Sequence, residues 1–199
     1  EIADNAVDEH LAGYCSEITV TLNNDGTATI IDNGRGIPIG IHPKAGIPAV
    51  EVVFTVLHAG GKFGDGGYKI SGGLHGVGAS VVNALSVWLE VEIKVDGGVY
   101  RQRYERGKAV APLEKVGTCR KNDTGTKVTF LPDGEIFEKT RFKSDAIKSR
   151  MHETTYLNPG LTIHFEDKRS GSEEKITYSE PDGIKAYVKE LNNGKEAVT

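Results

Sequence analysis

Residues 60–79 read GGKFGDGGYKISGGLHGVGA, and this glycine-rich segment ends where an apolar helix is predicted over residues 79–85. Glycine lets a backbone approach a polyphosphate closely, and the free amides at a helix start attract anions. The chain has 25 glycines among its 199 residues, about twice the average share of ~7%. The segment therefore favours a nucleotide phosphate as its ligand, and a plain glycine-rich loop is the alternative.

Two familiar phosphate-binding motifs do not match this segment. A P-loop places Ser or Thr after its Gly-Lys pair, whereas Gly61-Lys62 is followed by Phe63. The dinucleotide-binding fingerprint reads Gly-x-Gly-x-x-Gly, whereas residues 73–78 have the reverse spacing, Gly-x-x-Gly-x-Gly. A nucleotide held here is bound by another design, with its magnesium ligand elsewhere in the chain.

The first residues predict an amphipathic helix over 1–14 that closes near Gly13, a residue typical of helix C-caps. At 3.6 residues per turn, four polar residues fall within about 100° of arc. This polar face holds Glu1, Asn5, Asp8 and Glu9, and the opposite side holds Ile2, Ala6, Val7 and Leu11. Asn is a poor helix former, so Asn5 in mid-helix favours a function for the polar face. A solvated polar face is the alternative.

A hairpin is predicted next, with strands over 18–22 and 27–31 joined by the turn Asn23-Asn24-Asp25-Gly26. Asp32 follows, at the point where the second strand leaves the sheet. A carboxylate there can accept a hydrogen bond from an exocyclic amine such as that of adenine. An ordinary Asp-Asn-Gly turn is the alternative.

Together these three segments resemble the GHKL ATPases, a superfamily that includes type II topoisomerases, Hsp90 chaperones, histidine kinases and MutL. The resemblance rests on Glu1-x-x-x-Asn5-x-x-Asp8-Glu9, on Asp32-x-Gly34-x-Gly36-Ile37-Pro38 and on Gly73-Leu74-His75-Gly76-Val77-Gly78. Residues 55–63 (TVLHAGGKF) and 68–78 (YKISGGLHGVG) look most like the B subunits of bacterial type IIA topoisomerases, DNA gyrase and topoisomerase IV. The similarity runs almost end to end, through residues 100–102, 124–126 and 157–160.

The resemblance implies a role for each matched residue. Glu1 matches the general base that polarises the attacking water, and Asn5 matches the magnesium ligand. Asp32 matches the carboxylate that reads adenine, helped by Thr126. The other nucleotide-binding positions that the family implies are Asp8, Gly36, Ile37, Pro38, Lys62, Tyr68, Gly73, Leu74, His75, Gly76, Val77, Gly78 and Ala79.

At the mouth of the pocket, the resemblance implies a rim that accepts competitive inhibitors of the aminocoumarin type. There Arg35 would pair with Glu9, and Arg101 would line the outer edge. Without the resemblance, residues 100–104 (YRQRY) read as an alternating strand in which Arg101 is an ordinary solvated arginine.

The family further implies ATP and Mg²⁺ as cofactors of an ATP-dependent type II DNA topoisomerase. In such an enzyme, ATP binding and hydrolysis drive DNA supercoiling and strand passage. The expected partners of the full-length protein are a second B subunit, the A subunit and double-stranded DNA. We expect gyrase rather than topoisomerase IV on base rate alone. A GHKL nucleotide-binding switch outside the topoisomerases is the further alternative.

The resemblance also suggests that the chain is one part of a longer subunit. It lacks the family's N-terminal arm, which reaches the partner subunit, and the transducer domain, whose lysine contacts the γ-phosphate. We therefore expect this chain alone to bind ATP with magnesium, to hydrolyse it poorly and to stay monomeric.

Composition predicts a single domain over 1–199. The net charge of −4 and the pI of about 5.9 argue against a main DNA-binding surface. Cys15 and Cys119 are far apart and form no CxxC pair, which fits a reducing, cytoplasmic compartment. No apolar run approaches the ~20 residues that span a bilayer, so no membrane contact is expected.

The rest of the sequence predicts an α+β fold. Helices are expected over 49–57, 79–85, 145–155 and 183–191, and strands over 87–95, 99–105, 125–131, 161–166 and 174–178. Antiparallel strands interleaved with helices favour one mixed, mostly antiparallel sheet covered on one face by helices. The resemblance identifies this two-layer sandwich as the Bergerat fold.

Overall fold

The computed structural model describes residues 1–57 and 78–192. The five helices in these residues are α1 (Ile2–Leu11), α2 (Ala49–Thr55), α3 (Gly78–Ala84), α4 (Ser144–Leu157) and α5 (Ile184–Leu191). The nine strands are β1 (Glu17–Leu22), β2 (Ala28–Asp32), β3 (Ser86–Val95), β4 (Gly98–Glu105), β5 (Lys108–Ala109), β6 (Glu114–Thr118), β7 (Gly125–Pro132), β8 (Thr162–Asp167) and β9 (Glu174–Ser179).

All nine strands join one mixed sheet in the order β5-β4-β3-β7-β2-β1-β8-β9, with β6 paired to β4. Within the described chain, β1 and β8 are the only parallel neighbours. The β3–β4 hairpin turns at Asp96 and Gly97, which both have the positive φ that a tight hairpin turn requires. The strand order places β2 inside the sheet, so its last residue, Asp32, lies opposite Thr126 of β7.

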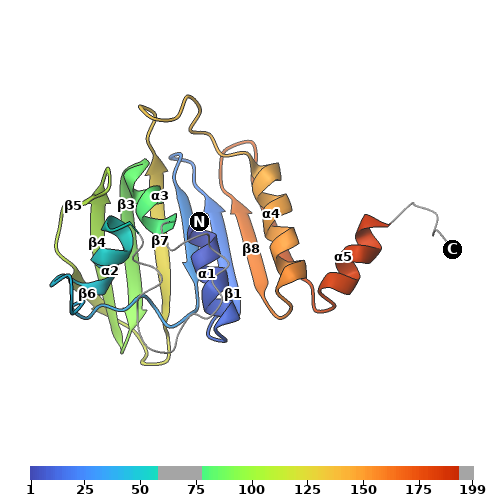
Figure 1. Ribbon diagram of the computed structural model, residues 1–199. Coiled ribbons are helices and arrows are strands. Elements are labelled where there is room, and N and C mark those ends of the chain that lie inside the picture. The colour runs from blue at the N-terminus through green and yellow to red at the C-terminus, as the bar shows by residue number, and fades with distance from the viewer. Residues whose placement is uncertain (58–77, 193–199) are drawn as a thin grey trace.

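The sheet has one covered face and one open face. Figure 1 shows α1, α2, α3 and α4 on the same side of the sheet. Alternate residues of β3 point to that side, and Leu89, Val91 and Ile93 are fully buried there. The residues between them, such as Glu90 and Glu92, pair with arginines of β4 instead. The predicted α+β sandwich with helices on one face is confirmed.

Three details differ from the sequence-based expectations. The helix predicted over 49–57 ends at Thr55, because Val56 has an extended backbone. The strands β5 and β6 were not predicted, since they are short and largely exposed and carry no alternating apolar pattern. Leu11 was assigned to the apolar side of the first helix but is 51% exposed. Leu11 lies in the last turn of α1, on the opposite side of the helix axis from Ile2, and this side of the helix faces solvent.

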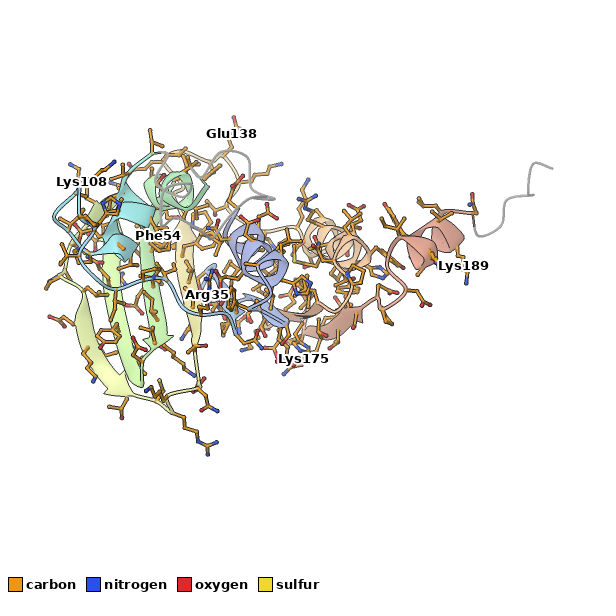
Figure 2. The ribbon with its side chains drawn as sticks, turned by 60° about the horizontal axis from the view of Figure 1, so that its bottom comes forward. Arg35, Phe54, Lys108, Glu138, Lys175 and Lys189 are labelled. Atoms are coloured by element: carbon orange, nitrogen blue, oxygen red, sulfur yellow. The ribbon has the colours of Figure 1, made fainter. Side chains whose placement is uncertain are left out.

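The C-terminal helix α5 stands apart from the layers. Figures 1 and 2 both show it projecting from the body beyond α4. None of its residues is buried, and its main described contact is the ring of Tyr187, stacked 4.9 Å from the ring of Tyr156 in α4. The candidate site therefore lies away from α5, among α1, α2, α3 and the sheet.

Candidate functional site

Asp32 is the best-defined polar group of the predicted site. The end of β2 leaves its side chain half-buried, and two backbone N–H groups donate to Oδ1, from Gly34 at 2.9 Å and from Thr126 at 3.3 Å. Burial raises the pKa of Asp32 to about 6, although both amides favour the ionised form. Both hydrogen bonds described for this carboxylate end on Oδ1, so Oδ2 is the oxygen that can receive a ligand donor.

The loop after β2 wraps closely around this carboxylate. A Cβ at Gly34 would lie 3.0 Å from Asp32 Oδ1 and 3.1 Å from Glu9 Oε2. Gly36 has φ +81 and passes over β3, where a Cβ would lie 2.8 Å from the carbonyl oxygen of Lys94. Gly36 therefore requires glycine, whereas a side chain at Gly34 would make the two carboxylates shift. Beyond them, Ile37 packs partly buried against the core, whereas Pro38 is exposed.

Arg35 and Glu9 form the ion pair that the resemblance implied. Arg35 Nη2 lies 2.8 Å from Glu9 Oε1, and Arg35 Nε donates to Glu9 Oε2 at 3.1 Å. The guanidinium also stacks on the ring of Tyr14, 3.8 Å from its centroid. This arrangement fixes the polar end of α1 to the loop after β2, and Figure 2 shows Arg35 beside α1. Its role at an inhibitor rim stays a prediction.

The polar face of α1 points toward the start of α3. The Glu1 side chain is exposed overall, but its carboxylate packs against Gly78, where a Cβ would collide with Glu1 Oε2. Asn5 is exposed one turn further along, and Asp8 is buried. The structure thus brings Glu1 next to Gly78 and Ala79, the last two residues of the predicted phosphate-binding stretch.

The remaining residues of that stretch are Lys62, Tyr68, Gly73, Leu74, His75, Gly76 and Val77, which lie outside the described residues. Gly78 and Ala79 open α3, and both are buried. Thr126 is also buried, beside Asp32. The roles assigned to all these residues stay predictions.

Arg101 lies on the open face of the sheet. Its strand neighbour Gln102 is buried under the helices, and strand alternation turns Arg101 the other way. Arg101 Nη2 lies 2.9 Å from Glu92 Oε2 on β3. No described contact joins Arg101 to Glu9 or Arg35. The position of Arg101 at the inhibitor rim therefore stays a prediction from the family resemblance.

Sequence reasoning missed two groups that shape the site. Tyr14 stacks on Arg35, but an aromatic residue after a helix end carries no signal of such a partner. Gly125 has φ +151, and a Cβ there would collide with the carbonyl oxygen of Asp32. Its glycine, next to Thr126, was a readable signal, since a glycine at the start of a strand marks a close backbone approach.

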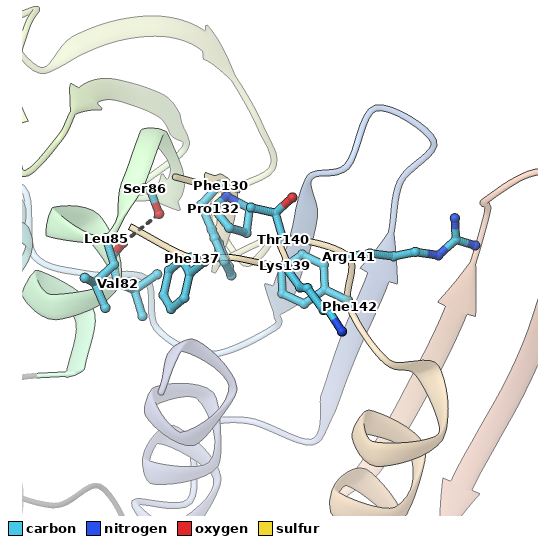
Figure 3. Close-up of a pocket in the computed structure, with 10 residues that line it drawn as sticks. All are labelled: Val82, Leu85, Ser86, Phe130, Pro132, Phe137, Lys139, Thr140, Arg141 and Phe142. Carbon is cyan, nitrogen blue, oxygen red and sulfur yellow. Dashed lines mark hydrogen bonds between the residues drawn. The ribbon is translucent and has the colours of Figure 1, made fainter. Parts of the chain in front are cut away.

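A well-formed cavity elsewhere is not this site. It has a volume of about 220 Å³ and lies between α3 and the segment that follows β7. Figure 3 shows its largely apolar wall, which includes Val82, Phe130 and Phe137. None of the predicted site residues lines it. Likewise, the described residues include no cluster of three or more His, Cys, Asp or Glu side chains suited to a metal ion, and no described helix is long and apolar enough to cross a membrane.

Comparison with known proteins gives consistent results. A family model for histidine kinase-, DNA gyrase B-, and HSP90-like ATPases matches residues 1–136. The whole chain is 58% identical to the B subunit of DNA gyrase from Thermotoga maritima and 56% identical to the B subunit of DNA topoisomerase 4 from Streptococcus pneumoniae. The chain spans 30% of the length of each of these relatives.

The solved structures agree. The 43K ATPase domain of Thermus thermophilus gyrase B, in complex with an aminocoumarin, superposes with a TM-score of 0.86 at 42% identity. The match covers all of this chain and 49% of that one. The chain therefore belongs to the histidine kinase-, DNA gyrase B- and HSP90-like ATPase family, and within it to the ATPase domains of bacterial type IIA topoisomerase B subunits.

Proposed function

We propose that this chain binds and hydrolyses ATP as part of a DNA gyrase B subunit, or of its topoisomerase IV counterpart. In the longer protein, ATP binding and hydrolysis drive strand passage and supercoiling of DNA. Gyrase and topoisomerase IV names occur among the relatives at 58% and 56% identity, so both assignments stand. The single observation that carries the proposal is the half-buried Asp32 carboxylate with one oxygen held by two backbone amides.

This carboxylate is suited to reading adenine. Gly34 and Thr126 saturate Oδ1, and the exocyclic amine of adenine donates to Oδ2. The pKa of about 6 leaves the carboxylate mostly ionised at neutral pH. A hydrogen bond to a charged, half-buried acceptor is among the stronger polar contacts in proteins. Gly36, Ile37 and Pro38 border the same pocket.

Glu1 supplies the chemistry of hydrolysis in this proposal. Phosphoryl transfer depends mainly on positioning and on charge stabilisation, with one group that orients the attacking water. In this proposal, the exposed Glu1 carboxylate beside Gly78 accepts a hydrogen bond from a water near the terminal phosphate. The neighbouring Gly78 and Ala79 belong to the stretch that holds the phosphates.

The residues present also fit a magnesium ion. Asn5 is exposed on the same face of α1 as Glu1 and offers an amide oxygen. Mg²⁺ prefers oxygen ligands, keeps several waters and often binds through substrate phosphates and one or two protein groups. When bound, it neutralises charge on the β- and γ-phosphates. Asn5 would hold the ion, and Glu1 would remain available for water.

The family suggests the partners and setting of the longer protein. These are a second B subunit, the A subunit, double-stranded DNA and a cytoplasmic location. The Thermus thermophilus relative was solved with an aminocoumarin, which supports binding of this inhibitor class, and the family resemblance assigns the inhibitor rim to Glu9, Arg35 and Arg101.

A base-specificity experiment tests the proposal. Inosine triphosphate carries a carbonyl where ATP carries the exocyclic amine, so the parent chain should bind it about 30-fold more weakly, the effect of one charge-assisted hydrogen bond. In Asp32→Asn, the new amide faces the base and should reverse the preference toward inosine triphosphate. Asp25→Asn, in the β1–β2 turn, is the control and should keep the parent preference. Equal binding of both nucleotides by the parent would contradict the proposal.

A further inference from the structure

The helices α2 and α3 flank the glycine-rich sequence, and their placement depends on contacts with the rest of the fold. Each has seven residues, which is too short for a stable helix on its own. Val50, Val52 and Phe54 bury the apolar side of α2. Apolar burial holds α2 against the fold, and directional polar contacts further restrict its orientation.

Gln102 provides the polar contact between α2 and the sheet. Its side chain on β4 is 1% exposed. Nε2 donates to Glu51 Oε2 of α2 at 2.6 Å and to the Ala111 carbonyl at 3.2 Å, while Oε1 accepts from the Tyr104 hydroxyl at 2.8 Å. Both amide hydrogens and the amide oxygen are used, which fixes the orientation of the amide. Glu51 is thereby held at one place on β4.

Asn83 provides the contact between α2 and α3. It is fully buried, and its Nδ2 donates to the carbonyl oxygen of Phe54 at 2.8 Å. Phe54 lies in the last turn of α2, where carbonyls lack partners within the helix. Its ring also lies 5.4 Å from the ring of Tyr104, between α2 and the sheet (Figure 2). Asn83 therefore caps α2 from the neighbouring helix.

The amide of Asn83 is not explained by stability alone. Its Oδ1 is buried and has no hydrogen-bond partner among the described residues, and such an oxygen destabilises the folded state. An apolar side chain at this position would avoid that cost. The side chain is therefore better explained by the bond that it makes to α2.

The other end of α3 meets the proposed catalytic group. Gly78 opens the helix, and the Glu1 carboxylate occupies the place of a Cβ on that glycine. A small displacement of α3 would therefore change the position of Gly78 relative to Glu1. Two described hydrogen bonds, Gln102 to Glu51 and Asn83 to Phe54, join β4 to α2 and α2 to α3, and the helices themselves connect these bonds to Gly78.

We infer that Gln102 and Asn83 are positioning residues for ATP binding. They hold α2 and α3 in a fixed relation to the sheet, and this keeps Gly78 and Ala79 in register with Glu1. Neither side chain touches the nucleotide. The inference rests on the proposed function, because it assumes that the start of α3 belongs to the phosphate-binding stretch.

Calorimetric titration of this chain with a non-hydrolysable ATP analogue and Mg²⁺ tests the inference. Asn83→Leu keeps the branched shape of the side chain, Gln102→Met keeps its length, and both remove the hydrogen bonds. Each should weaken analogue binding about five- to tenfold, measured well below its melting temperature. The double variant should lose less than the product of the two losses, since both act through α2. Glu51→Ala removes the same Gln102–Glu51 hydrogen bond at a less buried position. It replaces Gln102→Met in the experiment if that variant does not fold.

Ser86→Ala is the matched control. Ser86 is 1% exposed, and its hydroxyl donates to the Val82 carbonyl within the same segment, without reaching α2. It should lower the melting temperature but leave the affinity within twofold of the parent. The inference would be overturned if Asn83→Leu, together with Gln102→Met or its substitute Glu51→Ala, bound the analogue within twofold of the parent. It would also be overturned if Ser86→Ala lost as much affinity as these variants. Failure of the parent chain to bind would instead contradict the proposed function.

Discussion

Asp32 and Thr126 lie opposite each other in the β2–β7 ladder, and the Thr126 backbone N–H donates to Asp32 Oδ1 at 3.3 Å although 94 residues separate them. The sheet thus delivers a backbone donor to a carboxylate at the end of a strand. The same location buries the carboxylate and raises its pKa to about 6. The protonation of Asp32 therefore links the stability of the fold to the proposed binding of adenine.

Stability should fall with rising pH on account of Asp32. Since its folded pKa of about 6 exceeds the ordinary value of 3.8, the folded state binds the proton more tightly than the unfolded state. The contribution to the free energy of unfolding is greatest below pH 3.8 and is lost as the pH rises to about 6. The full effect is at most about 3 kcal/mol. Urea unfolding of the parent and of Asp32→Asn from about pH 4 to 7.5 should show the variant gaining relative stability with pH.

Nucleotide affinity should change in the opposite direction for the same residue. A protonated Asp32 loses acceptor capacity for the adenine amine, so analogue binding by the parent should weaken below about pH 6. Asp32→Asn has no such ionisation, and its profile reports only the titration of the phosphates. Parallel pH profiles of affinity for parent and variant would contradict this assignment.

Gly34→Ala should weaken nucleotide binding while leaving the fold intact. The added Cβ would lie 3.0 Å from Asp32 Oδ1 and 3.1 Å from Glu9 Oε2, so both carboxylates must shift. We expect about tenfold weaker analogue binding, equivalent to about 1.4 kcal/mol, and a small change in melting temperature. Gly40→Ala is the control, because nothing lies within 4 Å of its Cβ position. An unchanged affinity in Gly34→Ala would show that the loop does not border the binding site.

Arg169→Met should destabilise the fold strongly. The Arg169 guanidinium donates to both oxygens of Asp167, which is 3% exposed, and holds the pKa of that carboxyl well below its usual range. Removing the arginine leaves a buried charge without its partner, at a cost of about 3–5 kcal/mol. Because the pKa is depressed, this stabilisation is present above about pH 4 and is lost on acidification.

Chemical denaturation at neutral pH measures this effect. Lys168→Met is the control, since Lys168 pairs with Glu166 at the surface, 3.2 Å away, and should change the free energy of unfolding by less than about 1 kcal/mol. Equal losses of unfolding free energy in the two variants would show that the Asp167–Arg169 pair contributes no more to stability than the surface pair of Lys168 and Glu166.

Arg101→Ala should abolish competition between an aminocoumarin and the nucleotide without changing nucleotide affinity. The prediction comes from family resemblance, since Arg101 contacts Glu90 and Glu92 on the open face of the sheet. Arg103→Ala is a close control, because Arg103 shares the strand and the face and lies over the Trp88 ring. Displacement of a labelled nucleotide by an aminocoumarin measures the inhibition of both variants. Unimpaired inhibition of Arg101→Ala would remove this residue from the rim.

Local sequence patterns predicted much of the fold because they are physical signals. The turn residues before Gly26 and the alternating apolar residues around them specify the first hairpin, which places Asp32 at a strand end. A helix period likewise specified α1. It did not reveal that Leu11 is exposed, because the pattern defines a face of the helix but not how far the sheet extends beneath it.

The prediction of the site residues depended more on the resemblance to the family than on local sequence patterns. Nothing in Glu9 and Arg35 taken separately predicts that they pair, and the pairing was expected only from the family. The link from Gln102 to Glu51 was not predicted at all, since it joins residues 51 positions apart through a buried amide. Such contacts depend on how strands and helices meet, which local periodicity does not encode.

The most direct test of the central claim is calorimetric titration of the chain with a non-hydrolysable ATP analogue, with and without Mg²⁺, compared with Asp32→Ala. We predict saturable binding by the parent, strengthened by magnesium. Asp32→Ala should bind the analogue at least about 30-fold more weakly, the effect of one hydrogen bond to a charged acceptor. Absence of binding by the parent, or equal binding by Asp32→Ala, would contradict the central claim.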